Sequence, residues 1–209
     1  MYNPYQVVRE FEDTISKWAG AKYGVSVESC TAAIFLSCLY LRVREVEIPR
    51  FTYPGVACSI INAGGTVKFR DEDWTGVYKL KPYNITDGAL RFKEGMYEGG
   101  LHCLSFHMKK HLPIGRGGMI LTDNKEAAEW FKKMRFDGRT EGADFHTDYP
   151  RVVGWNMYLT PEQASRGLML FSTINQKGND DLVTSKQGYP DLSKCPAYKG
   201  AKDDYRTVR

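Results

Sequence analysis

The chain has 209 residues, of which 42% are hydrophobic and 26% charged, and its formal net charge is +4. This length suits one well-buried domain with a small appendage, and the composition is that of an ordinary soluble globular protein. The mild charge argues against a nucleic-acid-binding surface, and the richest apolar run, residues 32–41, is too short to span a membrane.

The amphipathic N-terminus, residues 1–18, predicts a helix and has no signal-peptide core. Further helices are expected at 32–41, 54–63, 125–135 and 161–174, and short strands at 23–27, 46–49, 66–69, 84–89, 101–106 and 119–122. The stretch 71–83 has room for a turn and one short strand. Alternation of strands and helices predicts an α/β domain of three layers, αβα, with a mostly parallel sheet.

We expect this domain to occupy residues 1–175. Residues 176–209 are polar and lack periodicity, so they predict a tail, or an arm that packs on a partner subunit. The five cysteines form no CxxC pair and no zinc-ligand spacing, which indicates a reduced, cytoplasmic protein without a metal site. His102 and His107 are close in sequence, but we place them at opposite ends of a strand-to-loop passage.

One segment suggests the chemistry. Ser105 precedes Lys110 by five residues, and the glycine-rich turn 115–118 follows. A serine can hold a phosphate while a lysine amine reaches an aldehyde on the same small molecule, and pyridoxal phosphate (PLP) carries both groups. Lys110 would then form an imine with PLP and, once freed, move a proton during catalysis. Lys109 is the alternative to Lys110, and its simpler interpretation is a solvent-exposed charge beside a helix or loop. The five-residue spacing from Ser105 favours Lys110.

Other residues supply the contacts that PLP needs. Ser29, Cys30 and Thr31 lie at a strand-to-helix turn, where free N–H groups and the helix dipole attract a phosphate. This turn can equally be an ordinary helix cap.

The cofactor ring also needs partners. Asp87 and Ala89 share one face of a strand end, so the carboxylate can keep the pyridine nitrogen protonated while the small side chain lets the ring lie flat. Tyr53 can cover the other ring face by stacking. The alternatives are a simple turn at Asp87 and a half-buried aromatic residue at 53.

The order of these pieces resembles the DegT/DnrJ/EryC1/StrS family of PLP-dependent sugar aminotransferases. The matching segments are Ser29-Cys30-Thr31-Ala32-Ala33, Phe51-Thr52-Tyr53, Asp87-Gly88-Ala89, Ser105 to Lys110, Gly115 to Gly118, Arg135 to Gly138, and Gly154-Trp155-Asn156. Cys30 replaces a glycine of the family pattern, and Arg116 replaces a glutamate.

The resemblance implies the large domain of fold-type I PLP enzymes. It also implies transfer of an amino group from an amino acid, glutamate by expectation, to a nucleotide-linked keto sugar. Asn156 would reach the cofactor phosphate of a neighbouring subunit, so the resemblance predicts a homodimer. Since related dehydratases carry histidine at the lysine position, Lys110 favours the transaminase.

Three departures from the family keep an alternative open. Leu90 stands where such enzymes usually have a glutamine near the substrate. The stretch 71–83 is too short for the usual strand-helix unit, and we expect the small C-terminal domain to be missing. The alternative is a subunit of the same fold that binds the cofactor but is catalytically inactive.

Overall fold

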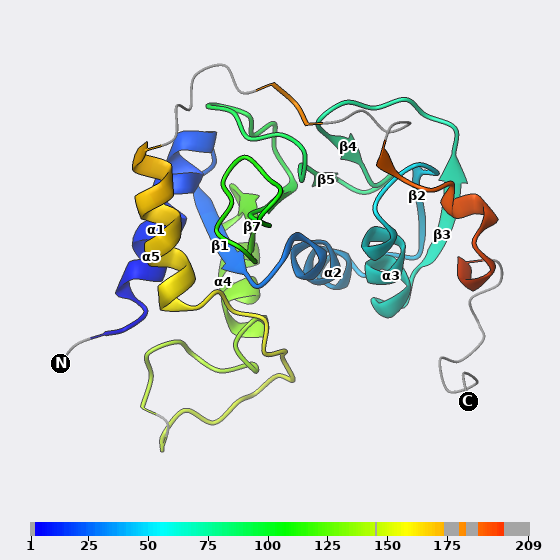
Figure 1. Ribbon diagram of the computed structural model, residues 1–209. Helices are drawn as coiled ribbons and strands as arrows, with labels where there is room; N and C mark the ends of the chain where they lie inside the picture. The colour runs from blue at the N-terminus through cyan, green and yellow to red at the C-terminus, as the bar shows by residue number, and fades with distance from the viewer. Residues whose placement is uncertain (1–2, 145, 174–179, 183–187, 199–209) are drawn as a thin grey trace.

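The computed structural model describes residues 3–144, 146–173, 180–182 and 188–198. A five-stranded sheet forms the centre (Figure 1), in the order β1 (Tyr23–Val27), β7 (Gly118–Thr122), β6 (Leu101–Ser105), β5 (Ile85–Asp87) and β4 (Tyr78–Lys79). A smaller sheet pairs β2 (Glu45–Pro49) with β3 (Thr66–Arg70). Backbone hydrogen bonds of 2.8 and 3.1 Å between Glu47 and Lys81 connect the two sheets. Strand β4 lies within 71–83, where the sequence predicted one short strand.

The sheet is mixed, and the prediction of a mostly parallel sheet is wrong. Only β5–β6 and β2–β3 are parallel, whereas β1–β7, β6–β7 and β4–β5 are antiparallel. Neither the connection from β6 to β7 nor that from β4 to β5 crosses over the sheet, so the strands that each of them joins run antiparallel. Even so, β1, β5 and β6 point the same way, because β7 reverses direction between β1 and β6.

Helices cover both faces of the sheet, which confirms the three layers. Helices α1 (Gln6–Ala19) and α5 (Pro161–Thr173) lie side by side on one face (Figure 1). Met119 and Leu121 of β7 belong to the same buried cluster as residues of these two helices. The other face holds α2 (Cys30–Tyr40) and α4 (Lys125–Met134), and α3 (Pro54–Asn62) packs on α2 and β3. Since side chains alternate along a strand, Ile120 joins this second layer.

Helices α2, α4 and α5 begin at side-chain caps, whereas the first residues of α1 and α3 are not capped in this way. The Ser29 side chain accepts a hydrogen bond from the N–H of Ala32 (3.1 Å), and that of Asn124 from Ala127 (3.2 Å). The Thr160 hydroxyl accepts from the N–H of Gln163 (3.4 Å), just before α5 begins at Pro161. Each cap satisfies an N–H group that the first helical turn leaves without a partner.

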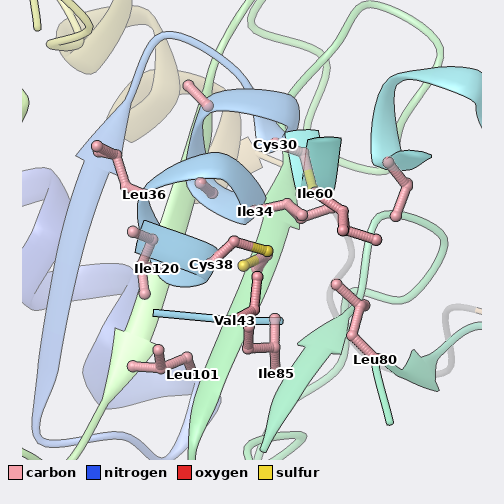
Figure 2. Close-up of a cluster of buried hydrophobic side chains, with 14 of the residues drawn as sticks. Cys30, Ile34, Leu36, Cys38, Val43, Ile60, Leu80, Ile85, Leu101 and Ile120 are labelled. Carbon is pink, nitrogen blue, oxygen red and sulfur yellow. The ribbon is translucent and has the colours of Figure 1, made fainter. Parts of the chain in front are cut away.

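The main core lies between α2 and the sheet. Ile34 and Cys38 of α2 belong to the same buried cluster as Ile85, Leu101 and Ile120 of the strands (Figure 2). Helix α2 is apolar on nearly all sides because it is enclosed by the sheet, α3 and α4. Its N-terminus is thereby held at the edge of the sheet where β1, β5 and β6 end.

The described parts of the predicted tail pack against this chain. Leu192 is fully buried, and its N–H donates to the carbonyl of Arg50 (2.8 Å). Asp181 forms an ion pair with Arg91 (2.6 Å), and the N–H of Leu182 donates to the carbonyl of Leu90 (2.9 Å). The rest of 176–209 lies outside the described residues, so an arm reaching a partner subunit stays a prediction.

Acidification should destabilise the fold through buried His102 on β6. Burial, with a smaller effect of Arg91, lowers its pKa from 6.5 to about 4. The unfolded chain therefore binds a proton near pH 6.5 and the folded chain only near pH 4, so stability falls as the pH drops through this window, by up to about 3 kcal/mol. Urea unfolding at neutral and acidic pH measures this. His102→Gln should remove much of the pH dependence, and an unchanged dependence would contradict the prediction.

Candidate active site

A large cavity opens at the edge of the sheet where β1, β5 and β6 end. Its volume is about 1500 Å³. Eight of the nine predicted site residues line it: Ser29, Cys30, Thr31, Tyr53, Asp87, Ala89, Ser105 and Lys110. They come together because the strands that carry or precede them end at the same edge, as ligand sites of α/β sheets do.

The N-terminus of α2 forms one wall of the cavity. Ser29 is the cap residue, and N–H groups of the first turn have no partner within the helix, so this wall can bind an anion. Strand β7 comes very close to it at Gly118. A Cβ added there would lie 2.4 Å from the carbonyl carbon of Ser29 and 2.5 Å from the nitrogen of Cys30, so only glycine fits.

Asp87 lies at the end of β5 with both carboxylate oxygens hydrogen-bonded. Oδ1 accepts from the N–H of Ala89 (3.0 Å), and Oδ2 accepts from the Tyr78 hydroxyl (2.8 Å). The Cys30 thiol is 3.9 Å from Oδ1. Burial raises the pKa of Asp87, while the hydrogen bonds and the positive charge of Lys110 partly oppose that shift. A cationic group in the cavity would therefore find a positioned acidic partner.

Lys110 comes from the loop between β6 and β7. Backbone hydrogen bonds shape this loop: the N–H of Met108 donates to the Gly115 carbonyl (3.0 Å), and that of Lys110 to the His107 carbonyl (2.8 Å). Burial lowers the pKa of the Lys110 amine, whereas Asp87 and Cys30 raise it. A lowered pKa increases the share of neutral amine, which is the form that attacks an aldehyde.

Lys109 also lines the cavity but has a different setting. Its side chain is exposed, whereas that of Lys110 is half-buried. Lys110 and Asp87 line the same cavity, and the charge of each shifts the pKa of the other. Lys110 is therefore the more enclosed of the two amines, and its assignment as the reactive lysine stays a prediction.

Tyr53 and Ala89 lie where the sequence placed them, on the cavity wall. Tyr53 is 55% exposed, so its ring face is available for contact with a bound group. Gly55 makes room for this ring, since a Cβ there would lie 2.7 Å from it. At position 88 the family pattern has alanine, but here a Cβ would lie 2.2 Å from the imidazole of His102, so glycine is required.

Asn156 does not line the cavity. It is exposed, and its side-chain amide donates to the Asp137 carboxylate (3.1 Å). A contact between Asn156 and the phosphate site of a second subunit stays a prediction.

Sequence reasoning missed several lining residues. Trp74, Leu182 and Tyr189 line the cavity, and buried Tyr78 stands behind it. The rings of Trp74 and Tyr189 are stacked, with centroids 6.3 Å apart. Residues from 71–83 and from the predicted tail therefore reach the site. In the sequence, the aromatic residues of these segments are the only feature that hints at such a role.

Among the described residues, no helix has both the length and the apolar character that crossing a membrane requires. In the same ranges, no three His, Cys, Asp or Glu side chains come close enough together to hold a metal ion.

The chain belongs to the DegT/DnrJ/EryC1/StrS aminotransferase family, which it matches over residues 1–87 and 94–180. Members of this family depend on PLP. The residues described above fit that cofactor: an anion-binding helix N-terminus, a half-buried lysine, a buried carboxylate and an open aromatic face share one cavity.

Individual relatives have low sequence identity to this chain. The chain is 24% identical over 198 residues to the spore coat polysaccharide biosynthesis protein SpsC of Bacillus subtilis (strain 168), covering 72% of this chain and 48% of SpsC. It is 24% identical over 253 residues to GDP-perosamine synthase of Escherichia coli O157:H7, covering 96% of this chain and 67% of that synthase. The chain thus spans about half the length of SpsC.

The fold agrees with solved structures. AtS13 from Actinomadura melliaura superposes with a TM-score of 0.71 at 22% identity, covering 83% of this chain and 61% of AtS13. Such neighbours are fold-type I PLP aminotransferases, and the matched part is mostly their large domain.

Proposed function

We propose that this protein is a PLP-dependent aminotransferase, which moves an amino group from an amino acid, glutamate by preference, to a nucleotide-linked keto sugar. The observation that carries the proposal is the common cavity of Lys110 and Asp87, whose charges influence each other. A reactive amine and a buried carboxylate at the two ends of one ring are what this chemistry requires.

Each residue has a defined task in the proposed reaction. Bound PLP supplies an aldehyde for amine exchange and a ring that withdraws electrons. Lys110 would hold the cofactor at its aldehyde carbon, and its amine would carry a proton during amino transfer. Asp87 would keep a proton on the ring nitrogen, while Ser29, Thr31 and the N-terminus of α2 would bind the phosphate.

The substrate class rests on the relatives. GDP-perosamine synthase is named for a nucleotide-linked amino sugar, which supports a nucleotide-linked keto sugar as the acceptor here. The cavity of about 1500 Å³ leaves room for such a molecule beside the cofactor.

We also propose that the protein forms a homodimer and is located in the cytoplasm. Asn156 is exposed and outside its own chain's cavity, as a residue that serves a second subunit would be. All five cysteines are free, which agrees with a reducing compartment.

The alternative is a subunit that binds PLP without turnover, and Leu90 favours it. This residue lines the cavity where the family pattern has a polar glutamine, so one substrate contact is apolar here. Spectral titration separates the two candidates. After PLP is bound, glutamate should convert it to the amine form, and a keto sugar nucleotide should reverse the change.

Each outcome of the titration has a clear meaning. Bound PLP that no amino acid converts would support the inactive subunit. Failure of the protein to bind PLP at all would overturn both candidates.

A further inference from the structure

Tyr78 lies directly opposite Asp87 in the antiparallel pair β4–β5. Its hydroxyl donates to Oδ2 of Asp87 at 2.8 Å and is also 2.7 Å from the Thr52 hydroxyl. All three side chains are buried, with exposed fractions of 4% for Tyr78, 1% for Thr52 and 6% for Asp87. They form a chain of hydrogen bonds that ends on the carboxylate.

The donors and acceptors of these hydrogen bonds follow from counting protons. Tyr78 has one hydroxyl proton, and the ionised Asp87 can only accept, so that proton lies between them. The Tyr78 oxygen is then free to accept, and Thr52 must be the donor. Both hydroxyl dipoles consequently point toward the carboxylate and favour its charged form. Burial together with the Asp87 charge raises the pKa of Tyr78 far above its usual range, so it remains a donor.

The ring of Tyr78 is held in place from the other side. The indole of Trp74 packs on it with ring centroids 4.8 Å apart. Its Nε1–H donates to the Phe51 carbonyl at 3.0 Å, which fixes the indole next to Thr52. The hydroxyl of Tyr78 therefore has little freedom to turn away from Asp87.

We propose that Tyr78, supported by Thr52, is a positioning residue that holds Asp87 ionised and aimed at the cofactor ring nitrogen. This inference rests on the proposed function and assigns a role to 71–83, the segment that is short relative to the family pattern. Burial alone would favour the neutral acid, which cannot keep a pyridine nitrogen protonated. The two hydroxyls oppose that tendency without adding a charge to the cavity.

The binding of PLP and of a PLP analogue to the full chain tests the proposal. Tyr78→Phe removes only the hydroxyl and should weaken PLP binding about tenfold, as expected for a lost hydrogen bond to a charged group. A PLP analogue with carbon in place of the ring nitrogen has no proton for Asp87, so wild type and Tyr78→Phe should bind it equally. Fluorescence or absorbance titration gives both dissociation constants.

Tyr83→Phe is the matched control. Its hydroxyl accepts the N–H of Arg44 at 2.7 Å, away from the cavity, so this variant loses a hydrogen bond in the same segment without affecting Asp87. It should bind PLP like the wild type. If Tyr78→Phe does not fold, Thr52→Val replaces it, with an expected loss of a few-fold for PLP and none for the analogue.

The outcomes are distinct. Equal PLP affinity of wild type and Tyr78→Phe would overturn the positioning role while leaving the proposed function intact. A loss of the same size for PLP and analogue would show general damage to the site and would likewise overturn it. Wild type that binds neither compound would reject the proposed function and this inference together.

Discussion

Lys110→Ala is expected to reduce transaminase turnover by at least about a hundredfold, the range for loss of a positioned acid–base group. The reason is that its half-buried amine is the one whose charge interacts with Asp87 inside the cavity. The variant should still bind PLP noncovalently, because the helix N-terminus at Ser29 and the carboxylate at 87 remain. Steady-state turnover with glutamate and a keto sugar nucleotide measures the effect.

Lys109→Ala is the matched control, since it removes a neighbouring and more exposed amine that lines the same cavity. Its turnover should stay close to that of the wild type. Borohydride reduction of the PLP-loaded wild type, followed by peptide mass mapping, should place the pyridoxyl group on position 110. A label on Lys109 instead would show that the assignment of the lysine is wrong.

Arg135→Met should lower the free energy of unfolding by about 3–5 kcal/mol, as is typical when one partner of a buried ion pair is removed. Arg135 is 1% exposed and pairs with Glu12, which is 2% exposed. Glu12 also accepts hydrogen bonds from the N–H and hydroxyl of Ser26, both at 2.8 Å. The cluster ties α1 and β1 to the end of α4, and methionine would leave the Glu12 charge buried without its partner.

Two further variants show that this loss comes from the unpaired charge. Glu12→Gln combined with Arg135→Met should recover part of the stability, because the amide still accepts from Ser26 but carries no charge. Lys125→Ala breaks an exposed ion pair of 3.8 Å with Glu129 and should cost less than about 0.5 kcal/mol. Urea unfolding of all three proteins is the measurement. If Arg135→Met cost no more than Lys125→Ala, the buried pair would not matter to the fold.

Local patterns in the sequence predicted much of the fold because they report local physics. Helix α1 follows from apolar residues at three- and four-residue steps, and α2 begins at Ser29 because a hydroxyl there can cap it. Strand directions were not predictable in this way. The antiparallel pairing of β7 depends on which strands become neighbours, and that choice is made by the packing of whole layers.

For the site, residue types and spacings in the sequence singled out Lys110, Asp87 and the turn at Ser29, and the structure brings all three to one cavity. The supporting residues were settled only by the tertiary structure. Nothing near Tyr78 or Tyr189 in the sequence indicates that one is paired with Asp87 and the other stacks on Trp74. The first contact depends on the register of β4 against β5, and the second joins segments far apart in the chain, so both form only in the folded molecule.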